Sequence, residues 1–468
     1  MAIGDRIVGH LPRGTPGCHT VARMAIALSW RLLPGADSLF STRDPSEPAY
    51  GVNAARLPPR GPAGMVPTMR FLTTSPLRGR RRAPFLLLVA MTACGTLGMH
   101  IIIPALPATA LALGMSIGVS QLTITLYLIG LAIGQLLYGP VSDRFGRRPV
   151  LLAGLSLFAG ASIITSVAPN AAVLIGARVL QSLGGCAGLV LGRAAVRDGA
   201  SAEKAAGQLA LLTLVMAMVP AIAPAIGGYL TAYIHWRASY VLLALFGVAT
   251  LTACLLMMPE TLSEPSGARR SMLLAYVRLL RSPRFLGYAV GGACSTTAFY
   301  GFMSASPFIF ETQLHQPTQR VGLYYLVLML GVAAGSLGAN RLAGRLSIQK
   351  ALRIANATAI LGAALFALAD MGNVLSVATV VAPVCLFMVG AGMASPFALA
   401  GSVSVNPQAI GAASGMYGFI QMGYGMLCTV VVETWHPGAV YPVATVLLGS
   451  ALLGQLAMSM AVRAERRR

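Results

Sequence analysis

Charged side chains are scarce in this chain. Asp, Glu, Lys and Arg make up 10% of the 468 residues, whereas soluble domains carry about 25%. Acids are the scarcer kind, with 13 Asp and Glu against 34 Lys and Arg, and 56% of residues are hydrophobic. A chain of this composition cannot form a water-soluble globule, so we predict a polytopic membrane protein. Its basic residues lie between apolar segments without interleaved aromatics, which argues against nucleic acid as a partner.

Cysteine usage gives no sign of a disulfide framework or a metal centre. Six of the seven cysteines lie inside apolar runs, and none has paired or metal-type spacing. Enzyme motifs are missing too: no His-Glu-x-x-His sequence and no phosphate-binding loop occurs, and Gly114–Gly118 matches Gly-x-Ser-x-Gly without a strand-turn-helix context. We therefore expect no metal, no cofactor and no enzymatic activity. The cysteines are Cys18, Cys94, Cys186, Cys254, Cys294, Cys385 and Cys428.

Residues 1–83 differ in composition from the rest of the chain. Proline, glycine and arginine are scattered without a period, and the best apolar piece, 21–33, is interrupted by Arg23 and Arg31. The region has no stretch able to span a membrane and lacks the cleavage pattern of a signal peptide. We predict a disordered N-terminal extension. In an alternative interpretation, the natural start is Met65 or Met69 and this region lies upstream of it.

From residue 84 onward, apolar runs of roughly 20 residues alternate with short polar breaks. At about 1.5 Å per residue, each run can cross a hydrocarbon core of about 30 Å. We predict an all-α integral membrane protein with twelve transmembrane helices. The expected spans are 84–104, 120–139, 150–168, 171–195, 209–231, 238–258, 284–310, 321–341, 351–370, 374–400, 408–431 and 438–462.

Basic residues in the connections predict how the helices are oriented. Past residue 77, the Lys and Arg of the connections lie at one end of the spans, apart from Arg237 and Arg320 at the other. Short cytosolic loops carry an excess of Lys and Arg. Both termini are therefore expected in the cytosol, as an even number of spans requires.

The spans fall into two sets of six. The break at 259–283 is the longest, and we expect it to be a cytosolic loop between an N-terminal half, 84–258, and a C-terminal half, 284–462, with a basic tail at 463–468. Three positions recur after an offset of 201 residues, which indicates a parallel duplication. The matching pairs are Gly130 and Gly331, Gly134 and Gly335, and Arg144 and Arg345.

A short polar turn separates the second and third spans. Residues 139–149 read GPVSDRFGRRP. Such a turn cannot lie in lipid. The positive-inside rule explains its arginines, but it does not explain why two glycines and an aspartate occur at fixed spacings from them. We predict a functional loop formed by Gly139, Asp143, Arg144, Gly146, Arg147 and Arg148.

Two further features lie inside spans. Arg178 is about seven residues, or roughly 10 Å, from the outer end of the fourth span. Charge at that depth is costly, so its side chain should face the protein interior or a water-filled cavity. In the fifth span, two prolines leave backbone carbonyls without their helical N–H partners. Two glycines nearby allow a neighbouring helix to pack closely, and together these features predict a hinge. These residues are Pro220, Pro224, Gly227 and Gly228.

Together these motifs resemble the bicyclomycin and chloramphenicol resistance (Bcr/CflA) branch of the major facilitator superfamily, a group of 12-helix drug:proton antiporters. The resemblance covers residues 84–462. The stretches that carry it are 104–107, 135–149, 178–185, 193–198, 220–228 and 300–310.

The resemblance implies two pseudo-symmetric six-helix halves that rock around a central cavity. It implies that Asp143 and its arginines form a cytosolic latch and that Arg178 is linked to proton transfer. Members of this branch usually carry an aspartate four residues before the first helix-1 proline, where this chain has His100. A histidine can carry a proton near neutral pH. For His100, a coupling role and a plain polar lining role both stay open.

The predicted function is export of small amphiphilic drugs across the bacterial inner membrane in exchange for protons. An uptake permease or an uncoupled facilitator for a small metabolite is the alternative. Since no acid lies in the middle of a span, neutral or zwitterionic substrates are favoured; Glu311, Asp370 and Glu433 lie near outer ends and are expected to be solvated. The expected partners are the substrate, the proton and the lipid bilayer, with the chain a monomer.

Transporter cavities for such compounds are largely apolar with a few polar groups. Aromatic, Met and Gln side chains in the predicted spans are therefore candidates for lining the cavity, although most such side chains simply pack. The candidates are Tyr127, Gln181, Phe299, Tyr300, Phe302, Tyr324, Tyr325, Met393 and Gln421.

Overall fold

The computed structural model describes residues 83–199, 202–262, 269–343, 345–406 and 410–466. The described residues all belong to one compact unit, Pro76–Arg468. The predicted N-terminal extension lies outside the described residues, except for its last residue, Ala83. The described residues form helices joined by turns and contain no strand.

The first six predicted spans are all formed. Pro104 and Pro107 cannot donate to a helical ladder, so the first span passes through a short 3₁₀ turn between two α segments. The elements are α3 (Phe85–His100), η3 (Ile103–Ala105), α4 (Leu106–Ala112), α5 (Ile117–Phe145), α6 (Arg147–Ser166), α7 (Ala171–Gly199), α8 (Ala202–Tyr233) and α9 (Arg237–Met257).

The last six spans follow a connecting helix, α10 (Arg269–Leu280), which forms inside the predicted loop 259–283. Ser282, Ser347 and Ser376 each cap the next helix by accepting a hydrogen bond from a backbone N–H of its first turn. The elements are α11 (Pro283–Thr297), α12 (Phe299–Phe308), η4 (Ile309–Gln313), α13 (Thr318–Leu342), α14 (Ile348–Met371), α15 (Val377–Ser404), α16 (Ile410–Trp435) and α17 (Val440–Arg466).

The seventh span is interrupted. Eleven helices among the described residues are long and apolar enough to cross a membrane alone, whereas this span consists of α11, with 15 residues, and α12, with 10. At the break, the carbonyl of Ala298 accepts the N–H of Gly301 at 3.0 Å, a 3₁₀ bond in place of an α-helical one. The prediction of an all-α fold with twelve spans is confirmed, with the seventh made of two segments.

Matching helices in the two halves pack alike. Gly130 on α5 faces α7, where an added Cβ would lie 1.9 Å from Ser182 Oγ. Gly331, its partner in the duplication, lies on α13 and faces α15, where a Cβ would lie 2.7 Å from the carbonyl oxygen of Cys385. The second and fourth spans of each half therefore meet at equivalent glycines, as expected for a duplicated unit.

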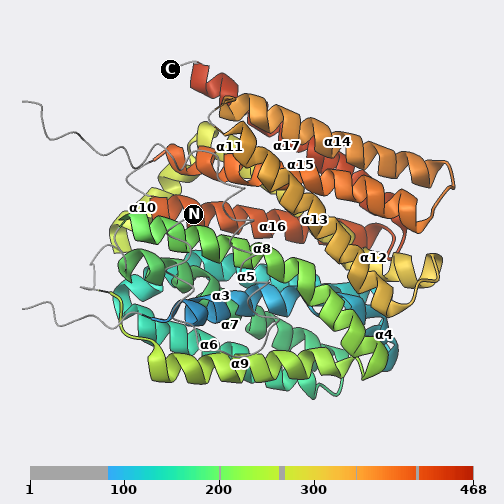
Figure 1. Cartoon of the computed structure of the whole chain (residues 1–468), viewed down its shortest axis with the longest axis horizontal. Helices are drawn as coiled ribbons and strands as arrows, with labels where there is room; N and C mark the ends of the chain where they lie inside the picture. Colours follow the sequence, from blue (N-terminus) through green and yellow to red (C-terminus); the bar gives the residue numbers. More distant parts are fainter. Residues whose placement is uncertain (1–82, 200–201, 263–268, 344, 407–409, 467–468) are drawn as a thin grey trace, which may run out of the picture. The chain divides into compact units, whose positions relative to one another are not determined.

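The two halves meet along two helix pairs. α5 packs against α16, and α8 packs against α13, which places these four helices where the two sets of spans adjoin (Figure 1). The α8–α13 contact is close, because a Cβ on Gly322 would lie 2.5 Å from the carbonyl oxygen of Pro224. The helices of each half otherwise pack mainly on one another.

Candidate functional site

The turn between α5 and α6 depends on Gly146. This residue ends α5 with φ +96° and ψ 150°, a conformation that side-chain-bearing residues rarely adopt. A Cβ at this position would also lie 2.8 Å from Glu260 Oε2. Glycine therefore allows both the sharp turn and the close approach of the Glu260 carboxylate.

Glu260 caps the start of α6 from a distant part of the chain. Its Oε1 accepts the backbone N–H of Arg147 and its Oε2 that of Arg148, each at 3.0 Å. The N–H groups of Thr261 and Leu262 also donate to Oε1. Burial works to raise the pKa of Glu260, but the hydrogen bonds from these four N–H groups outweigh it, and the pKa is lowered. The carboxylate thus accepts hydrogen bonds from two N–H groups of the first turn of α6, which have no partner within the helix.

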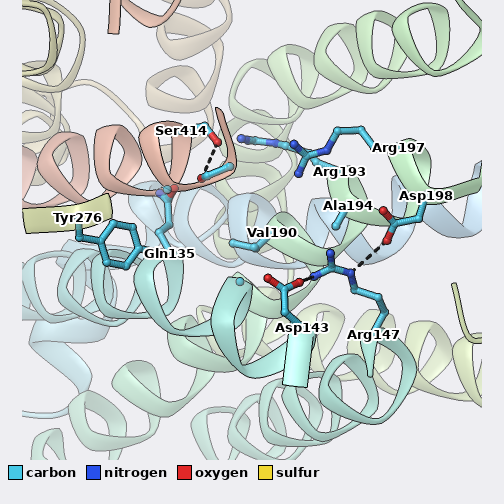
Figure 2. A pocket seen from close by; sticks show the side chains of 13 residues that line it. Gln135, Asp143, Arg147, Val190, Arg193, Ala194, Arg197, Asp198, Tyr276 and Ser414 are labelled. Carbon is cyan, nitrogen blue, oxygen red and sulfur yellow. Dashed lines mark hydrogen bonds and ion pairs between the residues drawn. The ribbon is translucent and has the colours of Figure 1, made fainter. Parts of the chain in front are cut away.

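Arg147 is the hub of the predicted latch. Its Nη1 lies 2.7 Å from Asp143 Oδ1, and its Nε lies 3.1 Å from Asp198 Oδ2 (Figure 2). The same Nη1 also donates to Ser142 Oγ at 2.5 Å. One guanidinium therefore joins α5, the start of α6 and the end of α7. Together with the Glu260 cap, it ties four elements of the first half at one end of the helices, which we call the arginine-rich end.

The other two predicted latch arginines have different surroundings. Arg144 is exposed, and its guanidinium lies over the ring of Phe145, 5.0 Å from the centroid. Arg148 donates from Nη2 to the carbonyl oxygen of Leu255 on α9 at 2.9 Å. Only Arg147 of the three arginines forms an ion pair within the described part of the chain.

A cavity of about 360 Å³ opens beside Arg147. α5 and α7 line it from the first half, and α16, with the connecting helix α10, lines it from the other side. Arg193 and Arg197 extend from α7 along its wall (Figure 2). The lining residues are Gln135, Gly139, Asp143, Arg147, Val190, Arg193, Ala194, Arg197, Asp198, Tyr276, Gly411, Ser414 and Gly415.

Tyr276 connects the first half to the connecting helix at this cavity. Its hydroxyl donates to the carbonyl oxygen of Leu136 at 3.5 Å. Burial raises the pKa of Tyr276, and the negative charge of Asp143 raises it further. Asp143 therefore acts electrostatically on α10 as well as on Arg147.

None of the nine predicted substrate residues lines this cavity. Tyr127, Gln181, Phe302 and Tyr325 are fully buried. Phe299 is also buried, and the other four are half-buried: Tyr300, Tyr324, Met393 and Gln421. Gln421 comes from α16 and donates to Thr296 Oγ1 on α11 at 2.8 Å. Contact of these residues with substrate stays a prediction.

Arg178 lies inside the first half. Its Nη1 donates to the carbonyl oxygen of Gly98 at 2.8 Å and to Gln181 Oε1 at 2.5 Å, and its guanidinium lies over the Tyr127 ring, 4.1 Å from the centroid. Gln181 in turn donates to Ser162 Oγ at 2.7 Å. The network joins the first four spans and leaves Nε and Nη2 without a partner among the described residues. The expectation that this side chain faces the protein interior agrees with this placement.

His100 ends α3, two residues after the carbonyl that accepts Arg178. It is buried, and its Nδ1 lies 2.8 Å from the carbonyl oxygen of Thr96. The ionisable ring of His100 is therefore close in sequence to Gly98, the residue of the first span that accepts the hydrogen bond from Arg178. The geometry is compatible with both roles left open for His100.

The proline and glycine residues of α8 lie at a junction. A Cβ on Gly227 would lie 1.8 Å from the carbonyl oxygen of Ile101 in the first span, and one on Gly228 would lie 3.0 Å from that of Thr318 in α13. Pro220 and Pro224 lie inside the helix just before them. The predicted hinge therefore contacts a neighbour in its own half and a helix of the other half.

Two of the three acidic residues expected to be solvated are less exposed than the sequence suggested. Glu311 is half-buried, and its Oε1 is shielded from water. Glu433 was expected to be solvated, but only 7% of it is exposed. It lies near the end of α16 and hydrogen-bonds to Thr125 on α5, whose hydroxyl also lies 2.7 Å from Thr429 Oγ1. The expectation for Glu433 was wrong because α5 covers this face of α16, which periodicity alone does not reveal.

Sequence reasoning also missed the roles of Glu260 and Asp198. The available signal was their rarity: each is one of only 13 acids, and each stands at the arginine-rich end of a span. An acid at such a position among many arginines is a candidate ion-pair or capping partner.

The family model of the Major Facilitator Superfamily matches residues 88–428. The chain belongs to this superfamily. Its members are transporters rather than enzymes, and this chain is a multi-pass membrane transporter. The solved structure of the xylose transporter XylE from E. coli shares the superfamily fold with it, with a TM-score of 0.61 at 15% identity over 80% of this chain and 96% of that one.

Two relatives define the branch of the superfamily. The chain is 31% identical to the chloramphenicol resistance protein of Pseudomonas aeruginosa, over 80% of this chain and 91% of that protein. It is 25% identical to the bicyclomycin resistance protein homolog of Haemophilus influenzae, over 77% of this chain and 91% of that protein. The Bcr/CflA resemblance is thereby confirmed.

Proposed function

We propose that this transporter exports small amphiphilic drugs across the bacterial inner membrane in exchange for protons. The names of its relatives support the substrate class. The observation that carries the mechanism is the arrangement of α5 and α16. They are joined at Thr125 and Glu433, while Asp143 and Ser414, at the opposite ends of the two helices, line an open cavity.

The orientation follows from charge. The arginine-rich end carries the basic connections, and the positive-inside rule assigns that end to the cytosol. Both termini are then cytosolic, the cavity opens inward, and the contact at Glu433 closes the outer side. Substrate would enter from the cytosol and leave after the halves rock.

The latch connects this rocking to the arginine-rich end. Asp143, Arg147, Asp198 and Glu260 hold α5, α6, α7 and the segment after α9 as one unit. Asp143 also lines the cavity opposite α10 and α16. Closure of the cavity would bring those helices toward Asp143, so the strength of its pairing with Arg147 sets the balance between the two conformations.

Proton coupling in this proposal involves Arg178 and His100. A buried guanidinium without an acidic partner stabilises negative charge nearby, and an imidazole can accept or release a proton. Neutral and zwitterionic compounds fit better than cationic drugs, because the partners of Arg178 among the described residues include no acidic side chain that could pair with a cation.

A drug-susceptibility panel in an efflux-deficient bacterial host tests the function. Cells that express the intact protein should tolerate chloramphenicol and other small amphiphilic drugs better than cells with an empty vector. The variants His100→Ala and Arg178→Ala show which residue export needs. Unchanged susceptibility to every drug at confirmed expression would contradict export.

Everted vesicles separate the alternatives. With an acidified lumen, chloramphenicol that enters through an antiporter should drive protons out of the lumen. An uptake permease coupled to protons would move drug and protons in the same direction, and an uncoupled facilitator would move drug alone. Either result would refute proton exchange while leaving the fold assignment intact.

A further inference from the structure

A polar cluster joins the two halves at the end opposite the cavity. Thr125 comes from α5, and Thr429 and Glu433 lie one turn apart on α16. The hydroxyl of Thr125 lies 2.7 Å from Thr429 Oγ1 and hydrogen-bonds to Glu433 Oε1. All three side chains are buried. We call these residues the outer cluster.

The contacts of the outer cluster are all satisfied at once only when Glu433 carries a proton. Thr429 Oγ1 donates to the carbonyl oxygen of Met426 at 2.7 Å, which uses the proton of that hydroxyl. Thr125 must then donate its own proton to Thr429. The two threonine hydroxyls therefore take part in three contacts, with Met426, with each other and with Glu433, but they supply only two protons. A neutral carboxyl group on Glu433 supplies the third proton, whereas with an ionised Glu433 the Thr125 hydroxyl donates to the carboxylate and its contact with Thr429 is left without a proton.

No cation replaces that proton. The two ion pairs among the described residues both involve Arg147, at the other end of the helices. α5, α12 and α17 pack against α16, as do α15, α11 and α10, and no cation of the described residues forms an ion pair with Glu433. A buried carboxylate without a cation is strongly disfavoured. Among the ionisable side chains of these elements, Tyr300 packs against Gly425 of α16 and Tyr441 packs against Trp435 and His436. Tyr127 instead lies against Arg178, and Cys385 lies against α13.

The outer cluster can open to water. Trp435 and His436, which follow Glu433, are exposed, and the connection after them is held by a hydrogen bond from Gln313 Nε2 to the carbonyl oxygen of Gly438 at 2.7 Å. Separation of α5 from α16 would therefore place Glu433 at the aqueous rim. There a carboxyl group can ionise at little cost.

We propose that Glu433 is the proton-loading group of the outer gate. When α5 and α16 are apart, its carboxylate takes a proton from outside water; when the proton is in place, the cluster closes. On reopening, the hydrogen bonds of Thr125 to Thr429 and Glu433 break and the proton returns to outside water, so Glu433 sets the pH dependence of the gate without carrying a proton across the membrane. This proposal rests on the proposed function, since the gate that Glu433 controls is the outer gate of the export cycle, and it assigns acid outside the cell the effect of favouring the closed outer gate.

Infrared spectroscopy of the purified protein tests protonation without a drug. The wild type should show the C=O stretching band of a neutral carboxylic acid, and Glu433→Gln should lose it. Asp370→Asn is the matched control, because Asp370 also lies near the end of a span, on α14, which packs within its own half. A band unchanged in Glu433→Gln would overturn the proposal.

Hydrogen exchange tests the gate. Glutamine keeps a donor in place at every pH, so peptides from 117–129 and 425–438 should exchange more slowly in Glu433→Gln than in the wild type at alkaline pH, and equally at acid pH. Thr125→Val, which removes the bridging hydroxyl, should speed exchange at both pH values, and Thr125→Ser should restore the wild-type pattern. Identical exchange in wild type and Glu433→Gln at alkaline pH would refute the gate. Since neither measurement uses a drug, the proposal can fail while drug export stands.

Discussion

The carboxylate of Glu260 accepts the backbone N–H groups of both Arg147 and Arg148, each at 3.0 Å. It thereby caps α6 from the segment that follows α9. The same turn carries the ion pair between Arg147 and Asp143. The arginine-rich end of the first half is thus stabilised by one carboxylate on the helix start and by two others on a single guanidinium.

Glu260→Gln should lower the stability of the folded protein by about 1 kcal/mol, because the amide offers the helix start one neutral acceptor in place of a carboxylate. Thermal unfolding in detergent at neutral pH measures the loss, with Asp370→Asn as the control. The folded pKa of Glu260 is lowered, so its contribution is present above the ordinary carboxyl value of 4.5 and disappears as pH falls through the lowered pKa. A difference between wild type and variant that persisted in acid would contradict the capping role.

Arg147→Gln should abolish drug resistance while folded protein still reaches the membrane. The substitution leaves Asp143 and Asp198 without their shared cation. Arg144→Gln is the matched control, because Arg144 is exposed and its guanidinium lies over the neighbouring Phe145 ring, away from both carboxylates of the latch. The test compares the drug resistance of cells that express the two variants at equal levels, measured with the susceptibility panel. Equal effects of the two substitutions would show that net positive charge, not the ion pair, matters.

Asp143→Asn should also leave folding intact and abolish resistance. The amide keeps the volume of the side chain but removes the charge that pairs with Arg147 and acts on Tyr276. Drug efflux from preloaded cells, measured beside membrane expression, checks this. Wild-type efflux by Asp143→Asn would exclude the latch.

Gly146→Ala should destabilise the fold by about 1–3 kcal/mol, because φ +96° strains any residue with a Cβ. The added methyl would also press against Glu260 Oε2. Gly139→Ala is the control and should be neutral, since an added Cβ at that position would meet no atom within 4 Å. The two unfolding midpoints are compared in the same detergent; coincident midpoints would mean that the turn relaxes freely.

Gly188→Ala should lower stability by about 1–3 kcal/mol, since its Cβ would lie 1.8 Å from the carbonyl oxygen of Met91 and α3 would have to move away from α7. Gly160→Ala on α6 meets nothing within 4 Å and should be neutral or slightly stabilising. Thermal unfolding of both variants gives the comparison. A stable Gly188→Ala would show that these helices are not held at the described distance.

Composition and local pattern determined the fold class of this protein. Runs of apolar residues long enough to cross a bilayer leave a helix as the only stable local structure, because every backbone polar group must be paired within the segment. The turn at 139–149 was likewise predictable, since charged residues between apolar runs must lie outside the lipid. The duplication showed in the recurrence of Gly130 and Gly134 at Gly331 and Gly335.

Only the tertiary structure decided which distant groups meet. The sequence shows that Glu260 and Glu433 lie near span ends, but not that one caps α6 and the other is buried against α5. It shows Pro307, but not the break at Ala298 nine residues earlier. The reason is physical: hydropathy and spacing report the preference of a segment for lipid or water, whereas a cap, an ion pair or a buried carboxyl depends on a partner brought close by the packing of other helices.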